Sequence, residues 1–156
     1  MARLARPKNY KVTKSFSLYN FVEGLAMPKE AIAMNWKNIA ELNEDNMKRI
    51  LERLQVMEEE INHKYKRFNG NKDIKLRITS GFRCEQWEIS RGRRVPSRHS
   101  RSLTVDFDTD TARVLNTRIL NEVFADYRST WQGGFAINPG KFIHIDFVLP
   151  VARWNY

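Results

Sequence analysis

The sequence predicts an α+β fold, with a small antiparallel sheet and N-terminal helices packed against it. Before residue 70, apolar residues recur at steps of three and four, the period of an amphipathic helix. After residue 70 the period changes to two, as in a half-buried strand. Helices followed by strands are typical of this class. Because 156 residues suffice for one core, we expect a basic arm over residues 1–15 and a single domain over residues 16–156.

Three helices are expected before the sheet. A short one covers residues 16–24, and a second begins at Pro28, because proline fits the first turn of a helix. The longest runs from about residue 43 to residue 68 and ends at Asn69-Gly70, a good C-terminal cap. Its apolar face consists of Met47, Ile50, Leu51, Leu54, Met57, Ile61 and Tyr65. The preceding arm carries basic residues and no acid, so we expect it to be exposed.

Three segments alternate between apolar and polar residues and are expected to form strands. Their apolar rows are Ile74, Leu76 and Ile78, then Leu103, Val105 and Phe107, and finally Ile143, Ile145, Phe147 and Leu149. Between the second and third segments, residues 111–127 return to helical spacing, with Asp110 as the expected N-cap.

Composition limits the classes of protein to consider. The 27 Lys and Arg residues exceed the 18 Asp and Glu residues, and the net charge of +9 favours an anionic partner such as nucleic acid or an envelope polymer. The single cysteine, Cys84, excludes an internal disulfide and a cysteine-rich zinc site, so we expect a buried thiol. Because no apolar run is long enough for a transmembrane span or a secretory signal, we expect a protein made in the cytoplasm.

The histidines indicate a metal site. Period-two geometry places His144 and Asp146 on one sheet face, opposite the apolar row, and Asp106 projects away from its own apolar row. If these strands are neighbours, Asp106, His144 and Asp146 can converge with His99. Two imidazoles and a carboxylate around an open position are a standard arrangement for catalytic zinc. The alternative is the ordinary polar face of a half-buried strand.

Five motifs occur in a characteristic order. They are Ile-Thr-Ser-Gly-Phe-Arg at 78–83, Ser-Arg-His at 97–99, Val-Asp-Phe at 105–107, Gly-Gly-Phe at 133–135 and Phe-Ile-His-Ile-Asp at 142–146. Their order resembles the M15 family of zinc peptidases, which includes D-alanyl-D-alanine carboxypeptidases and peptidoglycan endopeptidases. The resemblance covers most of residues 15–148. It implies the D-Ala-D-Ala carboxypeptidase or hedgehog-type fold, with Zn²⁺ as cofactor.

The resemblance also implies roles for individual residues. His99 and Asp106 correspond to the first two zinc ligands and His144 to the third, while Arg83 would contact the substrate carboxylate or the carbonyl under attack. Some family members carry a catalytic acid three residues before the last ligand, where this chain has Lys141. Asp146 is the expected replacement as general base.

Two features of this assignment stay open. Related enzymes with a His-x-His pair place the ligand second, so His144 and Asp146 can exchange the roles of ligand and base. Ser102 stands where the family pattern has glycine, so the turn between the first two ligands must accept a side chain.

The expected function is hydrolysis of peptide bonds in peptidoglycan stems or cross-links by a monomeric, phage endolysin-like protein that reaches the cell wall after release. Ser97 and Trp131 are expected to join Arg83 in binding the peptide, and the arginine-rich segment 91–101 would attract anionic groups. The alternatives are an inactive domain of the same fold that binds nucleic acid or an envelope polymer, and a structural phage or virus component.

Overall fold

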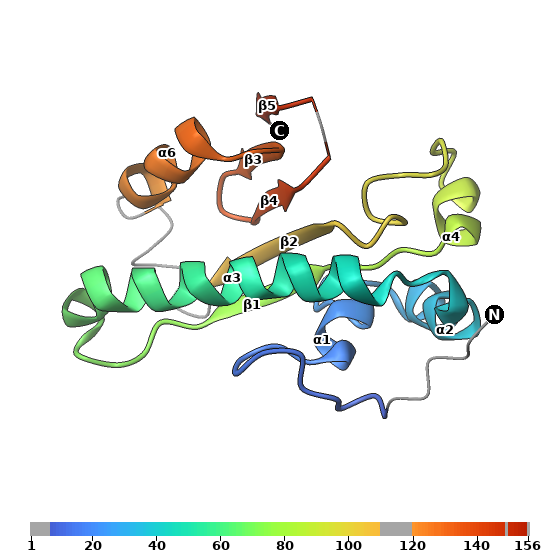
Figure 1. Ribbon diagram of the computed structural model, residues 1–156, viewed down its shortest axis with the longest axis horizontal. Helices are drawn as coiled ribbons and strands as arrows, with labels where there is room; N and C mark the ends of the chain where they lie inside the picture. The colour runs from blue at the N-terminus through green and yellow to red at the C-terminus, as the bar shows by residue number, and fades with distance from the viewer. Residues whose placement is uncertain (1–6, 110–119, 149, 156) are drawn as a thin grey trace.

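A computed structural model describes residues 7–109, 120–148 and 150–155. Its centre is a five-stranded sheet in the order β1-β2-β4-β3-β5 (Figure 1). The strands are β1 (Leu76–Ser80), β2 (Thr104–Thr109), β3 (Gly134–Asn138), β4 (Phe142–Asp146) and β5 (Ala152–Asn155). The first four in this order pair antiparallel, but β5 pairs parallel with β3. The α+β class is therefore confirmed, and the expected antiparallel sheet is corrected to a mixed one.

The described helices are α1 (Leu18–Val22), α2 (Lys29–Lys37), α3 (Glu44–Tyr65), α4 (Glu85–Ser90) and α6 (Leu120–Thr130), with 3-10 turns at Ile39–Glu41 and Lys66–Asn69. The predicted long helix is confirmed as α3, which Asn43 caps by accepting a hydrogen bond from the Asn46 N–H. Gly70 ends the following turn in the left-handed conformation at φ 61°. Asp110 and the first part of the helix expected at 111–127 lie outside the described residues.

The core lies between α3 and one face of the sheet, and α3 runs beside β1 and β2 in Figure 1. Alternation on β4 sends Ile143 and Ile145 into this core. It sends His144 and Asp146 to the opposite face, so the strand that closes the core also presents the polar cluster.

Residues 21–26 hold the end of β1 in place. Leu25 and Ala26 donate backbone hydrogen bonds to the carbonyls of Ile78 and Thr79. Gly81 lies so close to this segment that a Cβ atom would approach the Phe21 carbonyl oxygen to 2.4 Å. The glycine of the Ser-Gly-Phe-Arg segment is thus required by close backbone packing, which places Arg83 beside the polar face.

Part of the segment expected to be an exposed arm contacts the domain. The Thr13 hydroxyl and the Ser15 N–H both donate to the Gln55 side chain on α3, at 3.0 and 2.8 Å. Tyr10 and Val12 pack against the core. The expectation of an exposed arm is therefore corrected for Tyr10, Val12, Thr13 and Ser15, which are partly buried, whereas Lys11 and Lys14 are exposed. No helix within the described ranges is long and apolar enough to cross a membrane.

Candidate metal centre

His99, Asp106 and His144 form one buried group, here named the metal group, that could hold a metal ion. Asp106 on β2 lies opposite His144 on β4 in the sheet register, and His99 comes from the turn before β2. One potential ligand atom from each residue lies within 4.8 Å of the others. The antiparallel pairing of β2 with β4 therefore confirms the predicted convergence of these three residues.

His99 is held in the form that a metal requires. Its Nδ1 lies 2.7 Å from the carbonyl oxygen of Gly81, which can only accept, so Nδ1 carries the proton. Its Nε2 lies 3.5 Å from Asp106 Oδ2 and presents a lone pair to the group. Burial lowers the pKa of His99 to about 3, so this imidazole is neutral at pH 7.

Two serines shape the turn that carries His99. The Ser97 hydroxyl accepts from the Ser100 N–H at 3.0 Å, and the Ser97 N–H donates to the Ser100 hydroxyl at 2.8 Å. The expected substrate contact of Ser97 stays a prediction.

Ser102 adopts φ 60° and is fully buried, and its hydroxyl accepts from the Asn43 N–H at 3.0 Å. The turn therefore accepts a side chain where the family pattern has glycine.

His144 lies between two carboxylates. Its Nδ1 is 2.8 Å from Asp106 Oδ1 and its Nε2 is 2.7 Å from Asp146 Oδ2. Burial by itself lowers the pKa of His144, but the two carboxylates outweigh burial and raise it. Burial likewise opposes ionisation of Asp106, yet its neighbours His99, His144 and Arg83 hold its pKa below the ordinary value. A metal ion would replace the proton on His144 Nδ1.

Asp146 is fully buried, and its carboxylate has partners on both oxygens. Oδ1 accepts from the N–H groups of Gly134 and Val148 at 2.8 and 2.9 Å. Oδ2 meets His144 Nε2 and lies 3.4 Å from the Arg98 guanidinium. This arrangement orients the His144 ring, which is the usual task of a carboxylate behind a metal-binding histidine.

Arg83 contacts the metal group directly. Its guanidinium lies 3.3 Å from Asp106 Oδ2 and 3.8 Å from the Glu88 carboxylate, and its Nε donates to the Ser80 hydroxyl at 2.9 Å. The side chain is 17% exposed and lines a groove next to the metal group. It can therefore reach a ligand in the groove while it fixes Asp106.

The structure corrects the position expected for Trp131. The residue is 4% exposed, its indole N–H donates to the Asp146 carbonyl at 2.8 Å, and its ring stacks on Phe147. These contacts support the end of β4 from within the core. They leave no surface for the predicted peptide contact.

The sequence did not predict that a tryptophan side chain contacts the site. Trp154 on β5 lies with its ring centroid 4.9 Å from that of His144, and the Arg98 guanidinium lies 4.9 Å over the Trp154 ring. The position of Trp154 depends on parallel pairing between two strands, and no local pattern indicates such pairing. Only the motif position of Arg98, directly before His99, pointed toward the site.

The donor set fits a divalent transition metal. Imidazole nitrogen and carboxylate oxygen are ordinary zinc ligands, and three protein ligands leave a position open. The same donors also suit other first-row metals, so the chemistry of the group is compatible with zinc without selecting it. Cys84 is buried and lies outside this group.

Gly134 is predicted to be required for the site. An alanine Cβ there would lie 2.3 Å from Asp146 Oδ2, so Gly134→Ala must displace the carboxylate that orients His144. We expect the free energy of unfolding to fall by about 3 kcal/mol, at the upper end of overpacking, and metal affinity to fall with it. Gly140→Ala is the control, because that glycine has φ 72° and open space around its Cβ, so only about 1 kcal/mol of backbone strain is expected. Denaturant titration compares the two; equal losses would contradict the prediction.

The metal-free protein should lose stability as the pH falls from 6 to 4.5. The pKa of His99 is about 3 in the folded chain, whereas the ordinary value of 6.5 applies in the unfolded chain. Between these two values the unfolded chain therefore binds one more proton than the folded chain. Stability then rises with pH by about 1.4 kcal/mol per pH unit. His144 has a raised pKa, so its contribution is complete below pH 6.5 and does not change here. The free energy of unfolding, measured by denaturant titration in the presence of chelator, should rise with pH at this slope in wild type and in the control His63→Gln. In His99→Gln the slope should be smaller.

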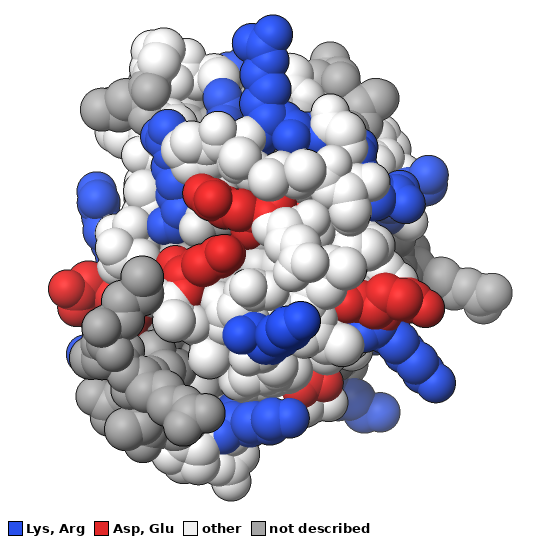
Figure 2. Space-filling model, turned by 90° about the vertical axis from the view of Figure 1, so that its right-hand side faces the viewer, with Lys and Arg blue, Asp and Glu red and all other residues white. Residues whose placement is uncertain are grey.

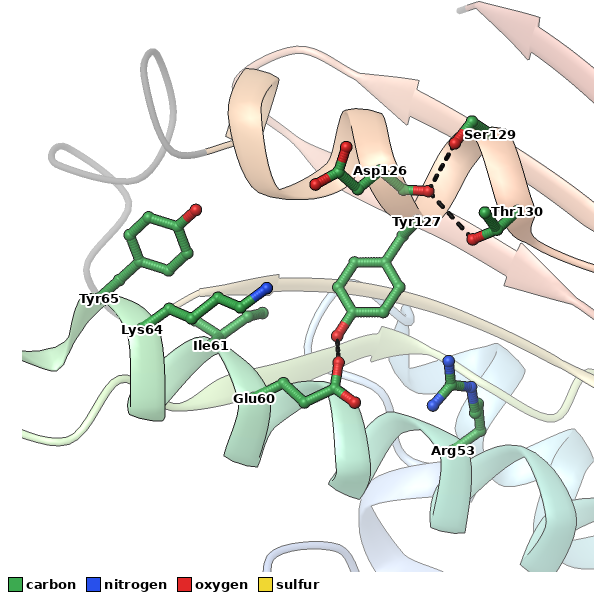
Figure 3. A pocket seen from close by; sticks show the side chains of 9 residues that line it. All are labelled: Arg53, Glu60, Ile61, Lys64, Tyr65, Asp126, Tyr127, Ser129 and Thr130. Carbon is green, nitrogen blue, oxygen red and sulfur yellow. Dashed lines mark hydrogen bonds between the residues drawn. The ribbon is translucent and has the colours of Figure 1, made fainter.

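A second pocket lies away from the metal group. Its residues come from α3 and α6, and the Tyr127 hydroxyl donates to the Glu60 carboxylate inside it (Figure 3). None of the three candidate ligands lines this pocket. This pocket is therefore separate from the metal group.

Charges of both signs share the end of the molecule that carries α2 and α4. Lys and Arg side chains there are separated by acidic and uncharged ones (Figure 2). Among the residues that the structure describes, this face presents no continuous basic surface of the kind that follows a nucleic-acid backbone.

The geometry of the site is the basis for a functional assignment, because comparison with known proteins adds none. No family model matches the chain, and no curated protein or solved structure matches it.

Proposed function

We propose that this protein is a zinc-dependent peptidase that hydrolyses peptide bonds in peptidoglycan stems or cross-links, acting at the cell wall after release. The observation that carries the proposal is the buried group of His99, Asp106 and His144, with ligand atoms within 4.8 Å of one another. The order of the sequence motifs, which resembles the M15 peptidases, supports it, as does the α+β fold.

The chain supplies the ligands and their support. His99 Nε2, an Asp106 oxygen and His144 Nδ1 would hold the ion, while Asp146 keeps the proton of His144 on Nε2. Zinc, when bound, lowers the pKa of its water toward about 7 and polarises the scissile carbonyl. Arg83 contacts Asp106 and lines the same groove, where it can orient the carbonyl or a carboxylate of the peptide.

One observation favours a second candidate, a metal-binding domain that binds without cleaving. Lys141 occupies the position of the usual catalytic acid and is exposed in the turn before β4. Asp146 is enclosed by its partners, and Asp106 is the one carboxylate among the described residues that line the groove. Amide hydrolysis needs a proton acceptor close to the attacking water.

Digestion of purified peptidoglycan separates these functions. The full chain, loaded with zinc and with its metal content measured by mass spectrometry, is incubated with cell-wall sacculi, and the soluble products are analysed by mass spectrometry. We expect released peptides with new amino and carboxyl ends, and no release in the presence of chelator. Zinc binding without any cleavage would exclude the peptidase and establish the second candidate. Failure to bind zinc would exclude both.

A further inference from the structure

We propose that Arg91 and Arg93 form an anion subsite beside the metal group, which binds a carboxylate of the substrate peptide at a distance from the scissile bond. The proposal rests on the proposed function and adds a determinant of specificity to it. The subsite lies in a groove of about 300 Å³ that opens on Asp106. A volume near the lower end for ligand pockets suits a short peptide segment.

The walls of the groove combine apolar and cationic surfaces. Its apolar part is formed by Ala26, Met27, Pro28, Trp87 and Phe142. Its cations are Arg83, Arg91 and Arg93, and the backbone there is that of the end of β1. Aliphatic side chains fit the first surface, and an anionic group fits the second.

A buried carboxylate fixes two of the three guanidinium groups. Glu88 on α4 is 1% exposed, and its Oε1 lies 3.2 Å from Arg93 and 3.8 Å from Arg83. An arginine that is already held loses less side-chain entropy when it binds a ligand. With five N–H donors on each guanidinium, Arg93 keeps donors beyond the one that meets Glu88.

Arg91 supplies the cation that is not neutralised. Its guanidinium lies 5.6 Å over the Trp87 ring, and within the described ranges no carboxylate pairs with it. The groove thus brings three guanidinium groups near two carboxylates, Glu88 and Asp106. Since Asp106 is a candidate metal ligand, its charge is directed to the ion when one is bound. The groove therefore carries a net positive charge, which faces a ligand bound in it.

A planar carboxylate matches the paired donors of a guanidinium, and a peptide with small side chains can fill the apolar part of the groove. A phosphate group carries similar charge, so the experiment must separate the two anions. The substrate class that the groove favours is a short peptide with small aliphatic side chains and a free carboxylate.

The test uses the full zinc-loaded chain and two uncleavable ligands. They are acetyl-Ala-D-Ala-D-Ala as free acid and as amide, with ketomethylene groups in place of the peptide bonds. Calorimetry should show that wild type binds the acid about tenfold more tightly than the amide, as expected for a charge-assisted hydrogen bond. Arg91→Gln should reduce this preference, and Arg91→Gln combined with Arg93→Gln should remove it.

Arg94→Gln is the matched control, because Arg94 is the next residue in the chain, is exposed and does not line the groove. It should keep the wild-type preference. Arg91→Gln alone leaves both Glu88 contacts in place, so its result does not depend on how the double variant folds.

Each outcome decides the proposal. Equal binding of acid and amide by wild type, or an unchanged preference in the double variant, would overturn it. If inorganic phosphate displaces the acid peptide at lower concentration than acetate does, the subsite is a phosphate site and the carboxylate assignment is wrong. A preserved preference in a protein that does not cleave sacculi would retain the subsite and reject the peptidase, so the two proposals fail separately.

Discussion

Replacing Asp106 with asparagine is expected to abolish stable zinc binding. The substitution keeps the size of the side chain but removes the negative charge that the two histidines share, at 2.8 Å from His144 Nδ1 and 3.5 Å from His99 Nε2. An amide is a poor zinc ligand beside imidazole, and two remaining ligands do not make a stable tetrahedral site. Zinc content after dialysis should fall from about one ion per wild-type chain to near zero.

The matched control for this variant is Asp108→Asn. Asp108 lies on the same strand but forms an ion pair with Arg77 at 2.9 Å, outside the metal group. Its variant should retain the wild-type zinc content, because a partly exposed ion pair contributes little to the fold. Retention of zinc by Asp106→Asn, or its loss from both variants, would contradict the assignment of Asp106 as a ligand.

The sequence predicted the parts of the site that depend on local period. Alternation on β4 separates Ile143 and Ile145 from His144, and this alone directs His144 away from the core. The helical period of the apolar residues in α3 identifies the helix that covers the apolar face of the sheet. Both patterns arise from neighbours in the chain, so they are visible without the fold.

The missed parts depend on contacts between distant segments. Trp154 reaches His144 only because β5 joins the sheet in parallel with β3. The four residues of β5 alternate between apolar and polar, but this pattern does not indicate which strand they pair with. Glu88 gives no sign of burial in the sequence, because an acid on a short helix usually faces solvent. It is buried here because two arginines from other parts of the groove pair with it.

The choice between His144 and Asp146 as third ligand also exceeded what alternation can decide, because both lie on one strand face. The N–H groups of Gly134 and Val148 engage one oxygen of Asp146, and His144 and Arg98 engage the other. His144 Nδ1 is directed at Asp106, and we expect Asp146 to act as a positioning residue for His144.

Asp146→Asn tests this distinction. The amide oxygen can still accept from the N–H groups of Gly134 and Val148, which places the amide NH₂ against His144 Nε2. His144 would then accept at Nε2 and carry its proton on Nδ1, facing Asp106, so the tautomer that can bind a metal is lost. Zinc affinity should fall about 10- to 100-fold, the usual effect of losing a carboxylate behind a histidine ligand.

The size of the loss separates a positioning residue from a ligand. If Asp146 were itself the third ligand, Asp146→Asn would lose zinc as completely as Asp106→Asn, and His144→Gln would retain it. With Asp146 as positioning residue, competition with a chromophoric chelator should rank Asp146→Asn between wild type and Asp106→Asn. The nitrogen NMR shifts of His144 in the metal-free variant should show a proton on Nδ1 and none on Nε2. Asp126→Asn on α6, exposed and outside the metal group, should match wild type in both measurements. Because the two assignments predict opposite results for His144→Gln, the pair of variants identifies the ligand even if one of them binds zinc weakly.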